Sequence, residues 1–431
     1  AQSFEWISST EGNTWQKSKA KLQTNAAQTP ILDVSGSEEG TVFKAWGTCF
    51  NELGWDALNM LPRKEQETIL HKLFSPEGEL RFTMGRFSMN ANDYARDWYS
   101  CDEVPGDFQL KYFNINRDKT TLIPFIKAAQ QYNPNMTFWM SPWSPPSWMK
   151  INHYYSVRSD RNQNQMSPLS DVALFEEKNT KVFPQQLAVN DYFIQDPRYL
   201  QTYANYFCKF IDAYKQQGIA ISMVMFQNES WSYTNYPGCA WTAEGIIRFN
   251  TEYLAPTLKK QHPEIKLYLG TINTNRYDVI DQVLSDPRMP ETIQGVGFQW
   301  EGGQILPKLR AKYPQYKYVQ TESECGWGSF DWKAAEHTFG LMNHYLGNGC
   351  EEYTFWNAIL YDGGFSGWGW KQNALIHVDS KAGTATYTPE YYAVQHYSHY
   401  ITPGSKILAY KTGKEDKTPV LVVMTPKKKQ V

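Results

Sequence analysis

Two glutamates end hydrophobic runs in this chain, and their positions suit acid–base and nucleophilic chemistry. Glu229 ends the run that begins at Met223, and Glu322 ends the run that begins at Tyr318. An ionisable group at the end of an apolar strand is unfavourable unless it has a partner or a function. An ion pair or a helix cap explains either glutamate alone as well as catalysis does. The two together favour a shared reaction site.

A pair of carboxyl groups roughly 5–5.5 Å apart hydrolyses glycosides with retention of configuration. One group starts protonated and the other attacks as a carboxylate. We expect Glu229 to be the acid/base and Glu322 to be the nucleophile, with Asn228 donating a hydrogen bond to the sugar 2-hydroxyl. Glu324 is the alternative nucleophile, because residues two apart in a strand share one face.

The elements that would position these residues alternate regularly between strands and helices. Eight apolar, β-rich runs occur at 42–49, 80–84, 136–140, 219–226, 265–270, 293–298, 316–321 and 352–356. Helical patterns occur at 66–74, 120–132, 199–217, 243–262, 277–284, 307–313, 333–347 and 390–401. Eight such units predict an α/β fold, a (β/α)8 TIM barrel whose active site lies at the carboxyl ends of the strands. An open doubly wound sheet is the alternative, but no glycine-rich phosphate turn follows the first run.

The ends of the chain differ from the middle. Residues 39–402 form the predicted catalytic barrel, while 1–38 and 403–431 are the expected N-terminal and C-terminal strands of a small side β-sandwich. The last part resembles a hairpin, and a lone hairpin is marginally stable. The abrupt stop at Val431 leaves open whether the natural chain continues. The connection Ser144–Asp196 is long enough to shape the active-site face and to decide between exo and endo action.

Composition narrows the classes of function. Net charge is −2, so nothing indicates a nucleic-acid partner. Aromatic residues make up 15% of the chain, with 16 Trp and 28 Tyr, which suits platforms for sugar rings or the packing of a large barrel. Thr242 is an expected helix cap and Gly218 an expected helix end.

Cofactor, membrane and location signals are weak. The six cysteines are scattered without metal spacing, and His396 and His399 are better explained by packing than by metal binding. We therefore expect no metal and no organic cofactor. There is no run of 18 apolar residues, so no membrane span is expected. The chain begins at Ala1. A removed signal peptide would explain this, as would a trimmed terminus, and we expect a secreted, periplasmic or cell-surface protein. The oligomeric state is left open.

A series of short motifs in a fixed order gives the chain a family likeness. They are Cys49-Phe50-Asn51-Glu52-Leu53-Gly54-Trp55, Arg86 with Asn92-Asp93-Tyr94, Ser141-Pro142-Trp143 with Ser147-Trp148-Met149-Lys150, Asn228-Glu229, Gln299-Trp300, Thr321-Glu322 and Trp356-Asn357. Each is weak alone, but the ordered series resembles glycoside hydrolase family 30, which includes lysosomal glucosylceramidase and bacterial β-1,6-glucanases. The resemblance also implies a side β-sandwich built from both ends of the chain.

The resemblance implies roles for further residues. It implies that Arg86 and Asp93 hold the sugar at the reaction centre, that Trp143 belongs to the sugar pocket and that Trp356 is a platform under the ring. A buried Arg86–Asp93 pair is the structural alternative. The implied substrate-binding residues are Arg86, Asp93, Trp143, Asn228, Gln299, Trp300 and Trp356. At the sixth strand the chain has Gln299 and Glu301 where the glucosylceramidase pattern has His and a Tyr that contacts the nucleophile, which leaves support of the nucleophile open.

These observations predict a retaining β-glycoside hydrolase that acts on an oligo- or polysaccharide, with β-1,6-linked glucan as the expected substrate. The alternatives are the same mechanism on a galactan, fucoside, xyloside or glucosylceramide, and a non-catalytic carbohydrate-binding barrel that would tolerate loss of Glu322. A phosphate-handling barrel enzyme would need a strand-end lysine and a glycine-rich phosphate loop, and neither is convincing here.

Overall fold

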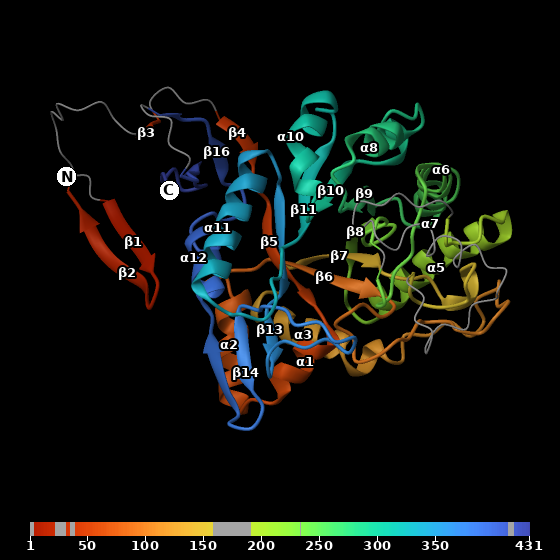
Figure 1. Cartoon of the computed structure of the whole chain (residues 1–431), viewed down its shortest axis with the longest axis horizontal. Helices are drawn as coiled ribbons and strands as arrows, with labels where there is room; N and C mark the ends of the chain where they lie inside the picture. The colour runs from red at the N-terminus through yellow and green to blue at the C-terminus, as the bar shows by residue number, and fades with distance from the viewer. Residues whose placement is uncertain (1–3, 22–31, 35–38, 158–190, 233, 413–417) are drawn as a thin grey trace.

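The computed structural model describes residues 4–21, 32–34, 39–157, 191–232, 234–412 and 418–431. Its centre is one eight-stranded parallel sheet with the strand order β11-β10-β9-β8-β7-β6-β5-β12. Helices surround this sheet (Figure 1). The strands are β5 (Ala45–Phe50), β6 (Met84–Met89), β7 (Thr137–Pro142), β8 (Ile221–Met225), β9 (Lys266–Ile272), β10 (Gly295–Gln299), β11 (Lys317–Glu322) and β12 (Glu352–Asn357).

The two edge strands of this sheet meet and close the barrel. Tyr318 forms a parallel bridge with Cys350. Beyond it, side chains take over the pairing: Gln320 Oε1 accepts from Thr354 N at 2.6 Å, and Ser323 Oγ accepts from Trp356 N at 2.9 Å. The closed sheet is covered on the outside by helices, so both faces of each strand are buried, which explains why the runs are apolar without alternation. The predicted TIM barrel is confirmed.

The described helices follow the predicted alternation. They are α1 (Glu52–Asn59), α2 (Arg63–Phe74), η1 (Asp118–Thr120), α3 (Leu122–Tyr132), η2 (Ser147–Met149), α5 (Pro197–Gln216), α6 (Ala243–Arg248), the π-helical η3 (Phe249–Leu254), α7 (Ala255–Gln261), α8 (Tyr277–Leu284), α9 (Met289–Thr292), α10 (Gly302–Lys312), α11 (Trp332–Gly347) and α12 (Pro389–Ser398). Thr242 caps α6 as predicted, accepting from Gly245 N at 3.0 Å. Gly218 has φ +79° just beyond α5.

Two predicted elements begin four or more residues away from the predicted start. The second strand was expected at 80–84, but β6 begins at Met84. Leu80 and Phe82 are buried in the connection before this strand, so their apolar pattern resembled that of a strand. Helix α10 was expected to begin at Pro307 but begins at Gly302. Pro307 lacks an N–H for the Gly303 carbonyl four residues earlier, and the His344 ring donates to that oxygen instead, at 2.6 Å.

A small sheet after β12 was not predicted. It consists of β13 (Ile359–Tyr361), β14 (Ile376–Asp379) and β15 (Thr384–Tyr387). The connection 362–375 between its first two strands brings Lys371 and Gln372 to the mouth of the barrel.

Segments from both ends of the chain pair with each other beside the barrel. Strand β16 (Lys406–Leu408) pairs antiparallel with both β4 (Glu39–Val42) and β18 (Val422–Met424), and β17 (Lys411–Thr412) pairs with β3 (Leu32–Asp33). The N-terminal hairpin of β1 (Phe4–Thr10) and β2 (Asn13–Ala20) lies on the same side of the molecule (Figure 1). The division of these segments into side-domain parts at 1–38 and 403–431 stays a prediction.

Packing explains the two histidines of α12 and its neighbourhood. The Trp15 ring lies 4.8 Å from the His396 ring between centroids, and His396 Nε2 lies 2.6 Å from Ser9 Oγ. His399 Nδ1 contacts the Glu79 carbonyl oxygen at 2.9 Å. Within the described ranges no group of three or more His, Cys, Asp or Glu side chains could hold a metal ion.

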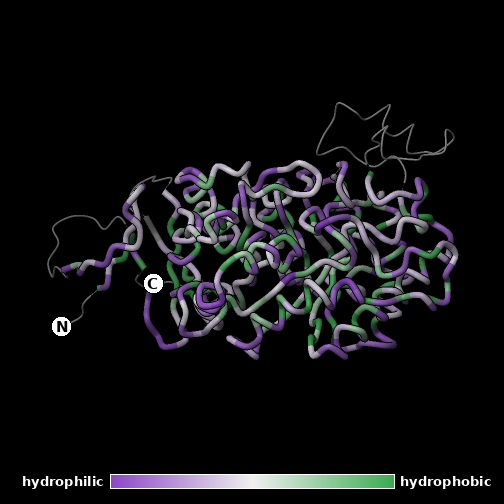
Figure 2. Tube along the Cα trace, turned by 90° about the horizontal axis from the view of Figure 1, so that it is seen from below, coloured by the Kyte–Doolittle hydropathy of each residue, from purple (hydrophilic) through white to green (hydrophobic). Residues whose placement is uncertain are grey.

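Hydrophobic segments run through the body of the molecule, whereas the N-terminal hairpin is largely hydrophilic (Figure 2). All six cysteines are buried and free. Of the helices that the structure describes, none combines the length and apolarity needed to cross a membrane. Much of the predicted long connection Ser144–Asp196 lies outside the described residues, at 158–190.

Candidate active site

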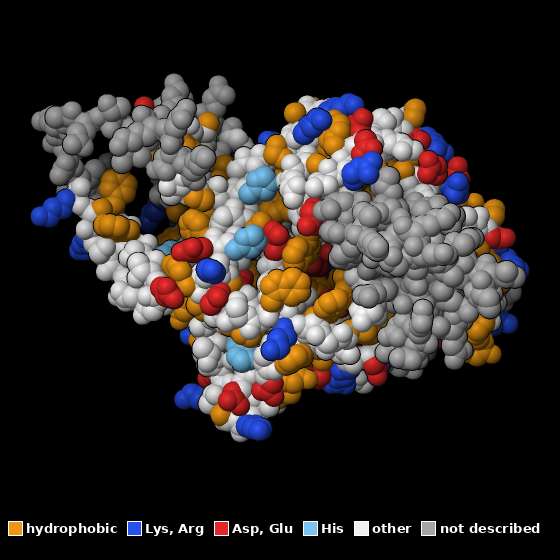
Figure 3. Space-filling view, viewed as in Figure 1, with side chains coloured by type: hydrophobic (Ala, Val, Ile, Leu, Met, Phe, Trp, Pro, Cys, Tyr) orange, Lys and Arg blue, Asp and Glu red, His pale blue; other side chains and the backbone are white. Residues whose placement is uncertain are grey.

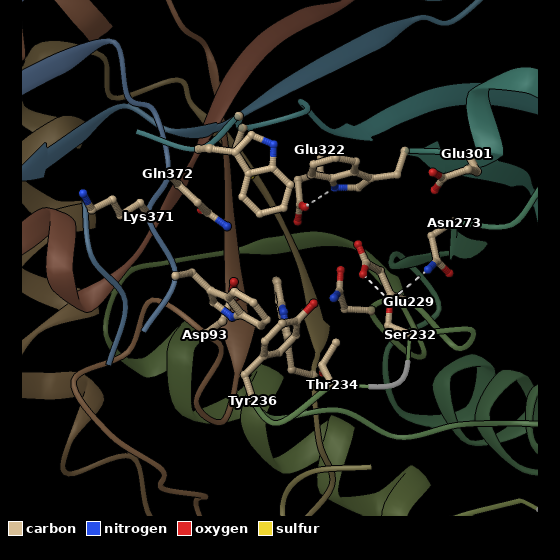
Figure 4. Close-up of a pocket in the computed structure, with 17 residues that line it drawn as sticks. Asp93, Glu229, Ser232, Thr234, Tyr236, Asn273, Glu301, Glu322, Lys371 and Gln372 are labelled. Atoms are coloured by element: carbon tan, nitrogen blue, oxygen red, sulfur yellow. Dashed lines mark hydrogen bonds between the residues drawn. The ribbon is translucent and has the colours of Figure 1, made fainter. Parts of the chain in front are cut away.

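A cavity of about 310 Å³ opens at the carboxyl ends of the barrel strands. On the surface it is a hollow with acidic side chains inside and hydrophobic side chains along its rim (Figure 3). The close-up in Figure 4 shows acidic and amide side chains converging on it. It is lined by Asp93, Trp143, Asn228, Glu229, Ser232, Thr234, Tyr236, Asn273, Trp300, Glu301, Glu322, Cys325, Gly326, Trp327, Trp370, Lys371 and Gln372.

Glu229 reaches this cavity from the turn after β8. Its backbone has φ +51°, a left-handed conformation that is uncommon outside glycine, and its N–H donates to Thr271 Oγ1 at 3.0 Å. Its carboxyl oxygens each accept one hydrogen bond, from Ser232 Oγ at 2.5 Å and from Gln299 Nε2 at 2.6 Å. The left-handed turn and these two donors fix the direction of the carboxyl group.

Glu322 is the last residue of β11 and lines the same cavity. Arg86 Nη1 lies 3.0 Å from one carboxylate oxygen, and Trp300 Nε1 donates to the other at 3.1 Å. Charged and ring N–H donors on both oxygens favour the ionised form of this carboxyl group. The sequence left open which residue near the sixth barrel strand, β10, contacts Glu322. The Trp300 indole, which directly follows this strand, provides that contact.

Arg86 is fully buried and connects the two halves of the site. Its second terminal nitrogen donates to Ser141 Oγ and to Asn228 Oδ1, both at 2.9 Å. The guanidinium lies 4.6 Å from the Trp139 ring and 4.5 Å from the Trp143 ring. Arg86 forms its ion pair with Glu322. The alternative considered from the sequence, a buried ion pair between Arg86 and Asp93, is therefore not what the structure shows.

The electrostatics of the two glutamates differ through their partners. Burial raises the pKa of Glu229, and burial also raises the pKa of Glu322. The Arg86 guanidinium lowers both pKa values, but its direct ion pair is with Glu322. Hydrogen bonds from Ser232 and Gln299 also lower the pKa of Glu229. The direct ion pair with Arg86 is therefore the main difference between the surroundings of the two carboxyl groups.

Asp93 adds a third carboxyl group to the cavity. Burial, followed by the nearby Glu229, raises the pKa of Asp93 to about 7. Asp93, Lys371 and Gln372 lie at one end of the cavity (Figure 4). At the opposite end Asn273 and Glu301 lie beside Glu229 (Figure 4).

Asn228 is oriented by its oxygen. That atom accepts from Arg86 Nη2 at 2.9 Å, from Gln299 Nε2 at 3.2 Å and from Thr271 Oγ1 at 3.2 Å. With the oxygen used in this way, the amide nitrogen of Asn228 is the group that can donate to a ligand, in line with its predicted contact to a sugar hydroxyl.

The predicted site residues fall into two layers. Glu229, Glu322, Asp93, Trp143, Asn228 and Trp300 line the cavity, while Arg86, Gln299 and Trp356 lie behind it. Trp356 is 1% exposed, stacks on Trp143 with 5.5 Å between centroids, and donates to Gln372 Oε1 at 2.7 Å. Trp143 and Gln372 both line the cavity, so Trp356 contacts its wall without lining it. The role of Trp356 as a platform under the sugar ring stays a prediction.

The strand-alternation argument for Glu324 was wrong. Strand β11 ends at Glu322, so the period of two does not extend to residue 324. The Glu324 carboxylate lies 3.5 Å from His337 Nε2, and Glu324 does not line the cavity.

Several lining residues were not singled out from the sequence. Asn273 directly follows β9, so the same search of strand ends that found the two glutamates could have found it. Lys371, Gln372 and Trp370 come from the irregular connection after β13, which carries no periodic signal.

Comparison with known proteins gives one family and several distant relatives. The model of the "Glycosyl hydrolase family 30 TIM-barrel domain" matches residues 43–164 and 192–401. Putative glucosylceramidase 1 of Caenorhabditis elegans is 26% identical over 394 residues, which cover 87% of this chain and 69% of that protein.

Two solved structures share the fold. SrfJ from Salmonella typhimurium superposes with a TM-score of 0.82 at 20% identity, covering 100% of this chain and 91% of that one. The endo-β1,6-glucanase BT3312 superposes with a TM-score of 0.77 at 19% identity, covering 96% and 88%.

Proposed function

The chain belongs to glycoside hydrolase family 30 and is a glycosidase, and from this we propose that it hydrolyses β-glycosides with retention, using Glu229 as acid/base and Glu322 as nucleophile. The observation that carries the proposal is the placement of both carboxyl groups in one cavity with unlike partners. Glu322 is paired with Arg86, whereas Glu229 accepts only from neutral groups. A retaining mechanism needs this asymmetry, because one carboxyl must be charged while the other holds a proton.

In the first step of the proposed reaction, Glu229 donates its proton to the leaving oxygen while the Glu322 carboxylate attacks the anomeric carbon. Arg86 and Trp300 hold the attacking carboxylate in place. Preorganised donors of this kind stabilise charge without reorganisation during the reaction. The bond between the anomeric carbon and the leaving oxygen breaks, and a glycosyl ester forms on Glu322.

The second step uses the same residues in reverse. Esterification removes the negative charge of Glu322, so Glu229 loses a like-charged neighbour and its pKa falls. As a carboxylate, Glu229 takes a proton from water, and the water oxygen attacks the anomeric carbon from the side that the leaving group vacated. The ester bond between the anomeric carbon and Glu322 breaks, which releases the sugar and restores the Glu322 carboxylate. Two carboxyl groups suffice for both steps.

The other side chains of the cavity suit recognition of a sugar. Asp93 can accept from adjacent hydroxyl groups, and the Asn228 amide can donate to the 2-hydroxyl, a contact that strengthens in the transition state. Trp143 offers an aromatic face at the same surface.

We propose β-1,6-linked glucan as the substrate, supported by the likeness to an endo-β1,6-glucanase. Because one relative is named a putative glucosylceramidase, glucosylceramide is the second candidate substrate. A galactan, fucoside or xyloside would use the same mechanism. We also propose that the protein is secreted or lies at the cell surface, because such a location fits a polysaccharide substrate.

The test is proton NMR of the first products from linear β-1,6-gluco-oligosaccharides. The proposal predicts that new reducing ends appear first as the β-anomer and mutarotate afterwards. Initial formation of the α-anomer would show inversion and refute the role of Glu322. Hydrolysis of aryl β-galactosides or β-xylosides without action on the β-1,6-linked glucans would refute the substrate and leave the mechanism standing.

A further inference from the structure

The end of the cavity beside Glu229 carries a hydrogen-bond acceptor that has no partner among the residues that the structure describes. Asn273 is 2% exposed and lines the cavity. Its amide nitrogen donates to Ser232 Oγ at 3.0 Å, while its oxygen has no hydrogen-bond partner among the described residues. A buried acceptor without a partner is unfavourable and calls for an explanation such as a bound ligand.

The orientation of the Asn273 amide follows from the network that holds Glu229. Ser232 donates its hydroxyl proton to Glu229, so the serine oxygen must receive a proton from its other neighbour. The amide nitrogen of Asn273 therefore faces Ser232, and the amide oxygen is left to face a ligand.

Glu301 provides a second acceptor at this end. It follows Trp300 at the start of α10, lines the cavity, and lies near enough to Glu229 to raise the pKa of that group. A carboxylate beside an unpartnered amide oxygen accepts hydrogen bonds from hydroxyl groups and repels a second negative charge.

The rest of the lining is aromatic and polar and contains few aliphatic groups. Among the described residues that line the cavity there is no Leu, Ile, Val, Met or Phe. Its apolar surface is mainly aromatic, and Trp327 is 78% exposed. Aromatic faces with polar neighbours suit the faces and hydroxyl groups of sugar rings.

We infer that Asn273 and Glu301 form the leaving-group subsite of this cavity and that this subsite takes the hydroxyl groups of a neutral sugar ring. The inference rests on the proposed function, because Glu229 defines the leaving-group side. A subsite of this kind favours an oligosaccharide over a glycolipid as the substrate. The inference also assigns substrate specificity to Glu301, at the position where the glucosylceramidase pattern has Tyr.

The experiment compares kcat/KM of the wild type, Glu301→Ala, Glu301→Gln and the control Glu324→Ala. The substrates are a β-1,6-linked glucose disaccharide, the same disaccharide with its reducing end oxidised to a carboxylate, 4-nitrophenyl β-glucoside and octyl β-glucoside. Loss of a hydrogen bond to a charged group corresponds to about 10- to 100-fold. Glu301→Ala should lower kcat/KM for the disaccharide by about tenfold more than for the nitrophenyl glucoside, and Glu301→Gln should lie between Glu301→Ala and the wild type. Glu324→Ala should match the wild type on every substrate, because Glu324 lies off the cavity.

The oxidised disaccharide separates recognition from structure. The wild type should cleave it more slowly than the neutral disaccharide, and Glu301→Gln should reduce that difference by removing the like charge. Equal losses on all substrates, or a common shift of the alkaline pH limb without a change in substrate preference, would overturn the inference and leave Glu301 as an electrostatic neighbour of Glu229. Preference of the wild type for octyl β-glucoside over the disaccharide would also overturn it. Absence of hydrolysis of any β-glycoside by the wild type would instead refute the proposed function.

Discussion

Replacing Arg86 by methionine should raise the pKa of the nucleophile and move the acidic limb of the pH–rate profile. Arg86 is fully buried, and its Nη1 lies 3.0 Å from Glu322. Removing one partner of a buried ion pair costs about 3–5 kcal/mol. At about 1.4 kcal/mol per pKa unit, this corresponds to a rise of roughly 2–3.5 units in the pKa of Glu322. The reaction needs the Glu322 carboxylate, so activity below the new pKa is lost.

The assay is kcat/KM for 4-nitrophenyl β-glucoside across the pH range, because this ratio reports the groups of the free enzyme. Arg86→Met should shift the acidic limb upward by about two units or more and lower kcat/KM near pH 6 by on the order of 100-fold. The alkaline limb should move upward by less, since Arg86 also lowers the pKa of Glu229 but has no direct contact with it.

Arg86→Lys is the matched variant, because lysine keeps a positive charge but cannot reproduce the hydrogen bonds to Ser141, Asn228 and Glu322 together. It should lose rate with a smaller shift of the limb. Near-UV circular dichroism and thermal unfolding show whether each variant is folded. A folded Arg86→Met enzyme with an unmoved acidic limb would refute the claim that Arg86 keeps Glu322 ionised.

Two further predictions concern the other carboxyl groups. Glu229→Gln should slow cleavage of unactivated oligosaccharides by about 10²–10⁴-fold and that of dinitrophenyl glycosides far less, in steady-state assays beside Glu324→Gln as control; equal losses on both substrates would contradict the acid role. Asp93→Asn should lower activity yet raise thermal stability at pH 8 and not at pH 4. Burial raises the pKa of Asp93 to about 7, so Asp93 ionises at a lower pH in the unfolded chain than in the folded protein. The free energy of unfolding of the wild type therefore falls by on the order of 4 kcal/mol between about pH 4 and 7. A variant no more stable than the wild type in calorimetry at pH 8 would contradict this.

The barrel and the two central glutamates were accessible from the sequence because both depend on regular features. Buried parallel strands produce apolar runs, and a glutamate that ends such a run is conspicuous. Strands β8 and β11 then place Glu229 and Glu322 at the same mouth, since the carboxyl ends of all barrel strands meet there.

The parts that escaped prediction depend on irregular backbone or on contacts between distant segments. The Trp300 indole reaches Glu322 from a residue with φ +50°, which no periodic pattern reveals. The sequence suggested Asp93 as an acidic partner of Arg86, and only the closed barrel shows that the ion pair forms with Glu322. Lys371 and Gln372 arrive on an aperiodic connection, so nothing in their neighbourhood indicated the site.

The central claim is that Glu322 bonds covalently to the sugar while Glu229 manages the proton. Incubation with a 2-deoxy-2-fluoro β-glucoside carrying a good leaving group, followed by proteolysis and peptide mass spectrometry, tests it directly. We predict one sugar per chain, attached to Glu322 and absent in Glu322→Gln. Attachment to Glu324 or Asp93, or turnover without any attached sugar together with an α-anomeric first product, would contradict the account.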